Sequence, residues 1–545
     1  MSQEEPDFIK SSAIMAAGTL VSRATGLIRN LLTVAALGTA LFADTFNVAN
    51  TIPTILYILL AGGALNAVFV PQLVRSMRND DDGGSAFASR LLTSVTSLLF
   101  LITALGIILA PLITRIYAPK FSLPGFETEQ SLTITFMRYC LPQILMMGIF
   151  VILSQIGNSR GKFGPMMWAP VLNNLVGIGV LLAFLLVAPD VSAETITPNQ
   201  TALLGIGTTA GFVVQALILI PVVKNSGLHL TARFDWRHSD LGKSFRLGSW
   251  TLLFVLINQI GYLIIVKVAT SAAVQAKLEG VTTGVGFTPY SYAYFIFILP
   301  HSIITVSVIT ALLPKISRLA HDHNDAAVQK NLIDSMRNVA VATVPSTILF
   351  IAFGTGIASL LYAGTSADDS RQIGLILAGF ALGLIPFSTM PLLLRGFYAY
   401  EDTKTPVVIN LFATGFMMLL AIVAEILVPF RYVTIALAII LGISNGLGTA
   451  LSIRALEKRI GRFPKKKLLL THGKLLLLSM VAIAPSFAIY AIIKEFVGES
   501  WISNALALAL GGLVFSATYI YGGRAAKVEE ITSLYGQILA RFRRK

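Results

Sequence analysis

Long apolar segments, separated by short polar connections, run through almost the whole chain. Each holds about 20 residues or more, which as a helix is enough to cross the hydrocarbon core of a bilayer. None of the connections is long enough to hold a folded domain. The pattern predicts fourteen transmembrane helices, over residues 12–37, 45–72, 91–114, 132–156, 165–188, 201–223, 246–270, 288–313, 337–363, 372–394, 406–429, 432–453, 475–493 and 501–522.

Composition supports a membrane protein. Of the 545 residues, 55% are hydrophobic and only 12% are charged, whereas soluble domains carry about 25% charged residues. The first ten residues, MSQEEPDFIK, are acidic rather than basic, so we expect no cleaved signal peptide. The single cysteine, Cys140, excludes an internal disulfide. We therefore predict an all-α polytopic membrane protein.

The distribution of Lys and Arg predicts the orientation. If the N-terminus lies in the cytoplasm, 31 of the 41 basic residues fall in cytoplasmic segments, six in outer loops and four within spans. Cytoplasmic loops of membrane proteins are enriched in Lys and Arg, so we expect both termini in the cytoplasm. The same distribution accounts for the net charge of +14 without a nucleic-acid partner.

The chain contains signs of an internal repeat. FVPQLVRSM (69–77), after the second span, is similar to LLPKISRLA (312–320), after the eighth, and the prolines Pro71 and Pro314 lie 243 residues apart. Chance similarity between basic turns is the alternative to duplication.

A second match favours duplication, because NSRGKFGP (158–165) is similar to LLRGFYAYEDTKTP (393–406) at an offset of 235 residues. A duplicated six-span unit keeps its orientation, because six is even, and the copies are then related by an axis along the membrane normal. The predicted organisation is an N-lobe over 1–223 and a C-lobe over 224–455. A basic linker, two further spans and a basic cytoplasmic tail then occupy 456–545.

Four stretches carry a resemblance to a known family. GTLVSRATGLIRN (18–30), ADTFNVANTIP (43–53), AGGALNAVFVPQL (61–73) and RGFYAYEDTKTPVVIN (395–410) resemble the MurJ/MviN lipid II flippases, within the superfamily of multidrug and oligosaccharidyl-lipid exporters. The similarity runs from about residue 11 to residue 455 and is weaker beyond it. It implies two six-helix lobes and two extra helices. In the family these enclose a V-shaped cavity for the lipid-linked peptidoglycan precursor, with a side groove for its polyprenyl tail.

The resemblance also shows two departures. Family members often carry an arginine shortly after the proline that matches Pro53, where this chain has Tyr57. They often carry an arginine and an acidic residue shortly before the position of Pro300, where this chain has Phe295 and Ile298. How the cavity compensates for these missing charges is left open by the sequence.

Two arginines lie inside the first span. Arg23 lies about eleven residues into it, hence ~16 Å deep, near the bilayer midplane. A charge at that depth costs from ~2.5 kcal/mol upward unless it faces a wet cavity or a partner. A substrate-facing role and a structural role beside a carbonyl or carboxylate are both open. Together with the family resemblance, Arg23 is the first candidate for substrate binding. Ser22, seven residues before Arg29, shares the face of Arg29.

Arg29 and Lys267 lie near the outer ends of the first and seventh spans. Arg29 is a candidate for substrate contact, for snorkelling to the outer surface, or for a gating ion pair with Asp44. The alternative role of Asp44 is a favourable first-turn charge at a helix N-terminus. Lys267 either snorkels outward or replaces the charge missing at Phe295, and is the fourth substrate-binding candidate.

The segment after the tenth span is rich in charge. Arg395, Glu401, Asp402 and Lys404 are expected to form a cytoplasmic cluster that fixes lobe geometry or gates the inner mouth. Thr405 reads as the N-cap of the eleventh span. The basic run KRIGRFPKKK (458–467) is expected to contact anionic lipids.

The predicted function is movement of lipid II from the inner to the outer leaflet of the bacterial cytoplasmic membrane by alternating access, for cell-wall synthesis. We expect no catalysis, no cofactor and no resident metal; an unidentified coupling cation and the membrane potential are the candidates for the driving force. The cell-wall synthesis machinery is a candidate partner. A flippase for another polyprenyl-pyrophosphate oligosaccharide, a multidrug/cation antiporter and a non-transporting divisome scaffold are the alternatives. A glycosyltransferase is disfavoured, because the loops hold no carboxylate-base or metal motif.

Overall fold

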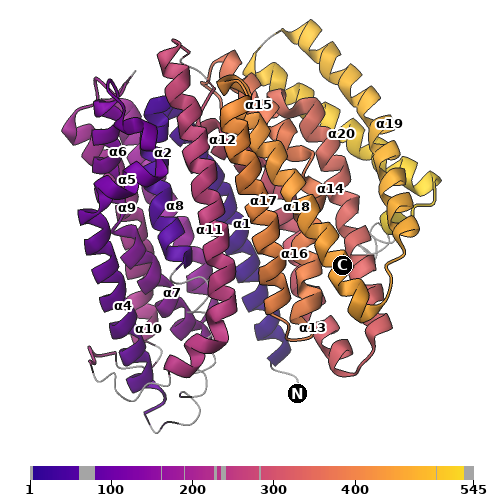
Figure 1. Cartoon of the computed structure of the whole chain (residues 1–545), viewed down its shortest axis with the longest axis horizontal. Coiled ribbons are helices and arrows are strands. Elements are labelled where there is room, and N and C mark those ends of the chain that lie inside the picture. The colour runs from indigo at the N-terminus through magenta and orange to yellow at the C-terminus, as the bar shows by residue number, and fades with distance from the viewer. Residues whose placement is uncertain are drawn as a thin grey trace. The chain divides into compact units, whose positions relative to one another are not determined.

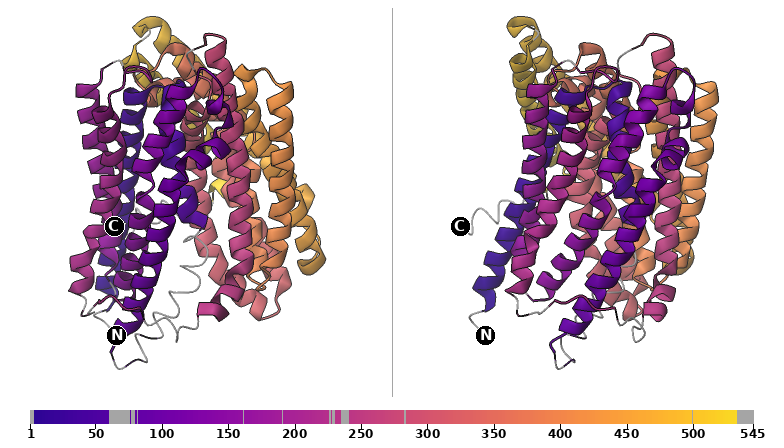
Figure 2. Two further views of the ribbon diagram at one scale, coloured as in Figure 1. Left: turned by 60° about the vertical axis from the view of Figure 1, so that its left-hand side comes forward. Right: turned by 90° about the vertical axis from the view of Figure 1, so that its left-hand side faces the viewer.

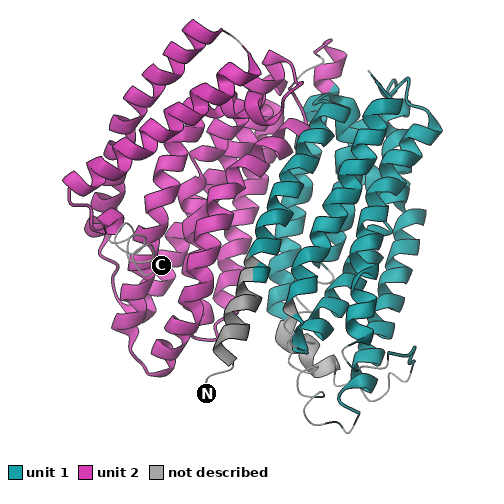
Figure 3. Ribbon diagram, turned by 180° about the vertical axis from the view of Figure 1, so that it is seen from behind, with its two compact units in different colours: residues 1–274 teal, residues 275–545 magenta. Residues whose placement is uncertain are grey.

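A computed structural model provides the fold of the chain. It describes residues 4–59, 76, 80, 82–160, 162–189, 191–225, 227, 230–234, 241–281, 284–498 and 500–532. Within these ranges every regular element is a helix. The chain divides into two compact units, residues 1–274 and residues 275–545 (Figure 3). This confirms the predicted all-α class.

The first unit holds the helices drawn in indigo to magenta in Figure 1. Both views of Figure 2 show these helices running side by side along a common direction. Their bounds are α1 Glu4–Leu37, α2 Leu41–Tyr57, α4 Ser85–Ile108, α5 Ala110–Tyr117, the 3₁₀ turn η3 Pro119–Ser122, α6 Glu127–Cys140, α7 Gln143–Ser159, α8 Phe163–Val187, α9 Pro198–Leu217, α10 Leu219–Lys224 and α11 Leu241–Leu278.

The second unit begins at residue 275, within the last turn of α11, and continues to the C-terminus. Its helices are α12 Phe287–Pro300, the π-helical turn η5 His301–Thr305, α13 Val306–His321, α14 Asp325–Leu361, α15 Ala367–Ala381, α16 Leu384–Tyr398, α17 Lys404–Leu427, α18 Phe430–Ile460, α19 Lys465–Val497 and α20 Trp501–Ala525.

The predicted spans correspond to these helices. Twelve helices or helix runs among the described residues are long and apolar enough to cross a membrane, and the bent pair α15–α16, with a 45° angle, makes a thirteenth. The remaining predicted span, 45–72, begins in α2, and its second half lies outside the described residues. The fourteen-helix prediction thus has a helix at every predicted position. Apolar side chains such as Leu186 and Phe496 are highly exposed, as expected where the neighbour is lipid rather than water.

The helix bounds repeat along the chain. The broken span α6–α7 starts at residue 127 and the broken span α15–α16 at residue 367, an offset of 240 residues. Helix α8 starts at residue 163 and α17 at residue 404, an offset of 241. These offsets lie close to those of the two sequence matches, 243 and 235 residues, as a six-helix repeat requires; the repeat itself stays a prediction. The predicted lobe boundaries follow the repeat, whereas the two compact units follow packing and divide the chain later, near the end of α11.

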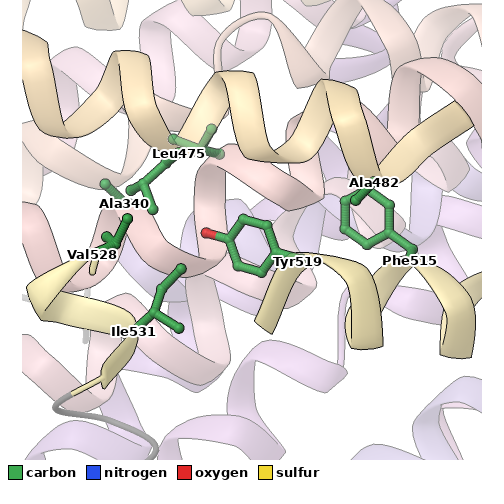
Figure 4. Close-up of a cluster of buried hydrophobic side chains, with 8 residues drawn as sticks. Ala340, Leu475, Ala482, Phe515, Tyr519, Val528 and Ile531 are labelled. Carbon is green, nitrogen blue, oxygen red and sulfur yellow. The ribbon is translucent and has the colours of Figure 1, made fainter. Parts of the chain in front are cut away.

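The last described residues fold back onto the second unit. After α20 the chain turns, and Val528 and Ile531 become buried against Leu475 of α19 and Ala340 of α14 (Figure 4). Tyr519 of α20 lies in the same cluster and donates a 2.9 Å hydrogen bond to the carbonyl of Val341. The C-terminal helices are therefore attached to α14 by both apolar packing and a buried hydrogen bond.

Candidate functional site

The arginine-bearing helix α1 packs against α8 in the first unit. The side-chain amide of Asn174, on α8, donates 2.9 Å to the carbonyl of Ser22 and 3.1 Å to the hydroxyl of Thr25. Gly26, one turn from Ser22, lies next to this amide: a Cβ there would be in van der Waals contact with Asn174 Nδ2, at 3.4 Å. Polar groups thus fix the middle of α1 in an otherwise apolar span.

Arg23 lies beside this contact and is exposed. It lies within the Ala17–Leu37 candidate membrane span, so an exposed charged residue stands in an otherwise apolar segment. Such an arginine is tolerated where it faces a water-filled cavity or a charged partner. The placement agrees with the substrate-facing alternative for Arg23, and its role stays a prediction.

Arg29, on the same helix, is half-buried and lies on α8 at Gly177. A Cβ atom at Gly177 would lie 2.8 Å from Arg29 Nε and 2.9 Å from its Cδ. Only a glycine allows the guanidinium to lie this close to the α8 backbone. The contact between Gly177 and Arg29 could not be predicted from the sequence, because Gly177 is one of several glycines in an apolar span.

Asp44 and Ser22 are placed less directly. Asp44 lies in the first turn of α2 and is fully buried, which suits a carboxylate near a helix N-terminus. Its gating ion pair with Arg29 stays a prediction. The Ser22 carbonyl faces α8 through Asn174, and the substrate contact of Ser22 also stays a prediction.

Lys267 lies on α11, half-buried, and is grouped with the first unit. Helix α1 ends at residue 37 and α11 at residue 278, an offset of 241. Arg29 lies eight residues before the end of α1, and Lys267 lies eleven residues before the end of α11. The two residues therefore occupy positions that differ by less than one helical turn when the helix ends are aligned. Tyr57 ends α2, and Phe295 lies on α12, both half-buried. Whether Lys267 replaces the missing charge at Phe295 is not decided by this placement.

The break between α6 and α7 has a polar interior. The Gln143 side chain, at the start of α7, donates 3.2 Å to Asn50 Oδ1 of α2 and 3.3 Å to the Thr209 hydroxyl of α9. Thr209 in turn donates 2.7 Å to the carbonyl of Tyr139, which the break releases from the helix ladder. A further buried pair, Asn173 to Gln215 at 2.7 Å, joins α8 to α9. The sequence analysis missed this network.

The corresponding part of the second unit is aromatic. Phe297 of α12 stacks on Phe380 of α15 with ring centroids 5.0 Å apart, and Phe387 of α16 meets Phe297 edge-on at 5.0 Å. His301, at the start of the π-helical turn, contacts Phe387 and lies 3.2 Å from the Ser388 hydroxyl. Within the described residues no group of three or more His, Cys, Asp or Glu side chains is arranged to hold a metal.

The predicted cluster after the tenth span is a set of local contacts. Arg395 lies over the Tyr398 ring at 5.6 Å. Asp402 accepts 2.9 Å from the Thr405 N–H and 2.7 Å from its hydroxyl. The prediction that Thr405 caps the helix is wrong, because α17 begins at Lys404 and its N-cap residue is Thr403, which makes no side-chain capping bond; Asp402, one residue earlier, accepts the Thr405 N–H instead. Lys404 is exposed.

Glu401 and its neighbour Tyr400 form the tight turn before α17. Glu401 is exposed and has a left-handed backbone with φ of 60°. Tyr400 donates a short hydrogen bond to Asp325 at the start of α14, and Arg459 at the end of α18 lies 4.0 Å over its ring. Burial, and then the bond to Asp325, raise the pKa of Tyr400 above its ordinary value. This turn therefore joins three helices, and Tyr400, Asp325 and Arg459 were missed from the sequence.

The all-helical fold, with twelve to thirteen helices or helix pairs among the described residues that are long and apolar enough to cross a membrane, defines a polytopic membrane protein. A solved structure described as an inward-facing multidrug resistance MATE family transporter of the MOP superfamily shares this fold, with a TM-score of 0.64, 14% identity, and 82% of this chain and 99% of that chain covered. A structure of lipid II flippase MurJ in an inward closed conformation has a TM-score of 0.71 at 20% identity, covering 94% of this chain and 99% of that one.

Sequence comparison identifies the family. The model of the lipid II flippase MurJ family matches residues 33–510, and the chain belongs to this family. A probable lipid II flippase MurJ of Haemophilus influenzae is 26% identical over 531 residues, covering 93% of this chain and 98% of that protein. One of Rhizobium tropici is 29% identical over 406 residues, covering 73% and 72%.

Proposed function

We propose that this protein moves lipid II from the inner to the outer leaflet of the bacterial cytoplasmic membrane, supplying the precursor for cell-wall synthesis. Membership of the lipid II flippase family supports this substrate. The observation that carries the mechanism is the pair of guanidinium groups on α1, one exposed at Arg23 and one lodged on the α8 backbone at Gly177. No bond is broken in this proposal; the protein recognises and moves its cargo.

The chemistry of the cargo explains the arginines. The pyrophosphate of a polyprenyl-linked precursor carries at least two negative charges, which hydrocarbon does not solvate. A guanidinium binds phosphate oxygens through two parallel N–H donors and stays charged at every physiological pH. Arg23 is then the primary phosphate contact, and Arg29 with Ser22 extends the same helix surface. Lys267, near the position of Arg29 in the repeat, contributes a further cation.

Alternating access of two repeated halves is the proposed movement. The membrane potential supplies ~2.3 kcal/mol per charge per 100 mV, and is the first candidate for the driving force. A coupling cation is the second candidate. The excess of Lys and Arg in the even-numbered connections supports an orientation with both termini in the cytoplasm.

Depletion and rescue in cells test the proposal. Cells depleted of this protein are complemented with the wild-type chain, Arg23→Ala or Arg23→Lys, and surface-exposed lipid II is measured by its accessibility to an externally added lipid II-cleaving enzyme. We expect exposure to fall on depletion, to return with the wild type, and to stay at least about tenfold low with Arg23→Ala, because a neutral side chain leaves the pyrophosphate unsolvated. Arg23→Lys keeps the charge and should rescue in part.

Two outcomes contradict different parts of the proposal. Normal lipid II exposure in depleted cells contradicts the flippase function. Full rescue by Arg23→Ala, with equal amounts of protein in the membrane, contradicts only the role of Arg23. Exposed Arg524, in the last turn of α20, supplies the matched control: Arg524→Ala also removes one positive charge, and it should rescue like the wild type.

A further inference from the structure

A basic cavity lies where the start of α19, the middle turns of α14 and the segment after α20 meet. Its volume is about 470 Å³. Seven charged side chains line it, of which five are basic and two acidic: Arg337, Lys466, Lys467, Lys474, Lys527, Glu529 and Glu530. The lining is therefore positive overall, and nothing in the proposed transport pathway uses it.

The two acidic residues are already engaged. Arg337 of α14, only 9% exposed, meets Glu530 Oε1 at 2.5 Å through Nε and Glu529 Oε2 at 3.1 Å through Nη2. Its Nε also donates 3.2 Å to the Thr471 hydroxyl of α19. Arg337 holds the pKa of Glu529 below its ordinary value by hydrogen bonding and by its charge, and Lys467 and Lys474 add to this effect. One buried arginine thus ties both carboxylates to the wall, and the lysines remain in excess.

Lysines occupy the N-terminal turn of α19, where the helix dipole disfavours positive charge. Residues 465–467 are all lysines and form the first turn of α19, whose cap residue Pro464 makes no side-chain capping bond. The N-terminus of a helix carries a partial positive charge and unsatisfied N–H groups, so cations there are destabilising and an anion is stabilising. Lys474 follows Lys467 by two turns and lies on the same face of α19. Lys465 pairs with Glu457 at 3.4 Å, outside the cavity. A further negatively charged group beside Lys466, Lys467 and Lys474 would be stabilised by their excess positive charge.

Lys527 adds an independent sign. It has a left-handed backbone, with φ of 51°, at the turn that ends α20. The Val528 N–H bonds the Gly523 carbonyl at 2.9 Å, as in a Schellman motif, where glycine is the favoured residue at the left-handed position. The chain carries a lysine there instead, and that lysine lines the cavity. Burial of Val528 and Ile531 next to it holds the turn in place (Figure 4).

We propose that this cavity binds the phosphate group of an anionic phospholipid. Phosphate is an anion that several ammonium groups bind together, and the positive end of a helix favours it. Leu470 lines the cavity and is 55% exposed, and the preceding Leu469 is 73% exposed, so an acyl chain finds an apolar surface beside the phosphate. Basic pockets between membrane helices at the cytoplasmic surface are known to hold lipid headgroups. The cytoplasmic placement rests on the proposed orientation; binding itself does not require transport.

The test measures lipid binding to the purified full-length protein by native mass spectrometry. Phosphatidylglycerol is titrated against the wild type and Lys466→Gln/Lys467→Gln, with phosphatidylcholine as the zwitterionic lipid. Lys458→Gln/Arg462→Gln is the matched control, because it removes two charges from the same basic run at exposed positions outside the cavity. We expect the first phosphatidylglycerol to bind about tenfold more weakly to the cavity variant and within about twofold of wild type to the control.

Two single variants probe the site in opposite directions. Lys527→Gly places glycine in the left-handed position, so the melting temperature should hold or rise while phosphatidylglycerol binds about threefold more weakly. Glu529→Gln removes a carboxylate near Lys467 and Lys474 while Glu530 still pairs with Arg337, so binding should tighten. Weaker phosphatidylglycerol binding by Glu529→Gln, or unchanged binding by Lys527→Gly, would contradict the assignment.

The remaining outcomes separate a cavity from its alternatives. Equal weakening in the two double variants would mean diffuse attraction to a basic surface and overturns the site. Equal affinity for phosphatidylcholine overturns selection of anionic lipid. Displacement by glycerol 3-phosphate at the concentration at which phosphatidylglycerol binds would assign the cavity to a soluble phosphate compound. Arg23→Ala should bind phosphatidylglycerol like the wild type, so failure of the lipid site and failure of the flippase function are distinguishable.

Discussion

Two membrane spans, α6–α7 and α15–α16, are broken at equivalent positions of the predicted repeat. Polar side chains surround the first break, and aromatic side chains surround the second. Between α6 and α7, Gln143 bridges Asn50 and Thr209, and Thr209 satisfies the released carbonyl of Tyr139. Between α15 and α16 the Thr347 hydroxyl lies 3.2 Å from the carbonyl of Ala381, but it lies closer, at 2.9 Å, to the Thr343 carbonyl of its own helix. There, however, the neighbouring side chains are stacked rings rather than amides.

This difference shows how the halves of the predicted repeat divide their tasks. A break in a membrane helix is tolerated when neighbouring helices satisfy the freed backbone groups. Thr209 donates to the freed carbonyl in the first half, and in the second half the Thr347 hydroxyl lies near it while also bonding within its own helix. The remaining space is free to vary. In the first half, amide side chains lie around the break, in the unit that also holds Arg23 and Arg29. In the second half, the rings of Phe297, Phe380 and Phe387 lie there instead. We infer that the handling of charge is concentrated in the first half.

Moving Arg29 without removing it is the most severe test of that inference. Gly177→Val places side-chain atoms where Arg29 Nε and Cδ now lie, so the guanidinium must leave the α8 backbone. If this arginine contacts the pyrophosphate, transport should fall by about a hundredfold, as small misplacements of a positioned group can cost. The assay is the rescue of surface-exposed lipid II in depleted cells.

Gly179→Val provides the control for this change. Gly179 lies two residues further along α8 and is exposed, and a Cβ there meets no atom within 4 Å. It should rescue fully, since it adds the same side chain to the same helix. Wild-type transport by Gly177→Val would show that the lodging of Arg29 on α8 is irrelevant to function.

Exchanging one residue between the two breaks tests whether their interiors are interchangeable. Gln143 starts α7 and Leu384 starts α16, at equivalent positions in the predicted repeat. Gln143→Leu leaves buried polar groups of Asn50 and Thr209 without this partner, and Leu384→Gln buries an amide among apolar groups. Each should lower the free energy of unfolding by about 2 kcal/mol.

Chemical denaturation in detergent micelles measures both exchanges. Leu382→Gln is the exposed control, two residues before Leu384, and should cost less because its amide faces the detergent in the folded and in the unfolded state alike. A neutral effect of Gln143→Leu would mean that the polar junction does not hold the first break in place.

Most of the fold follows from the sequence, because the bilayer leaves few choices. Backbone groups in hydrocarbon must bond internally, so each long apolar run becomes a helix. Two of these runs are interrupted by a short break between two helices, one at Pro142 and one at Leu382–Gly383. Pro and Gly are residues that interrupt helices, so these breaks too have a local cause in the sequence. The offset between the paired motifs predicted the repeat, and the helix bounds agree with it.

The site was predictable only in part, for a physical reason. A charge in an apolar span can be seen in the sequence alone, so Arg23 and Arg29 could be proposed as site residues; their roles stay predictions. The partners that give such a charge its place come from other helices, and Asn174 and Gly177 have no local sign. The predicted cap of α17 was wrong for a similar reason: Asp402, Thr403 and Thr405 are all of residue types that cap helices well, and the turn at Glu401 decided which of them the helix follows.

Weakening the aromatic junction measures what ring packing adds in the second half. Phe297 is 1% exposed and stacks on Phe380. Phe297→Leu loses this stacking in addition to volume, and should destabilise the protein by about 1.5 kcal/mol. Phe184→Leu in α8 makes the same change at a fully buried residue for which the described structure has no ring contact. Equal losses in thermal unfolding would show that the rings act only as volume.

A substitution of Tyr400, in the turn after α16, is expected to change the free energy of unfolding least, and its effect should depend on pH. Tyr400→Phe removes the hydrogen bond to Asp325 and should cost about 1 kcal/mol at neutral pH, measured by denaturation. The pKa of Tyr400 is raised in the folded state from its ordinary value of 10.0. The folded protein therefore holds this proton more tightly than the unfolded chain, so the contribution is complete below about pH 10 and is lost as the pH rises further.

The difference between wild type and Tyr400→Phe should accordingly be constant from pH 7 to about pH 10 and narrow above it, because the phenylalanine has no proton to lose. Tyr432→Phe, at an exposed residue beside α18's start, controls for the loss of a tyrosine and should change neither the stability nor its pH dependence. A difference that grows above pH 10 would contradict a neutral, donating Tyr400. In that case the joint between α14, α16 and α18 would depend on Arg459 over the ring rather than on the bond to Asp325.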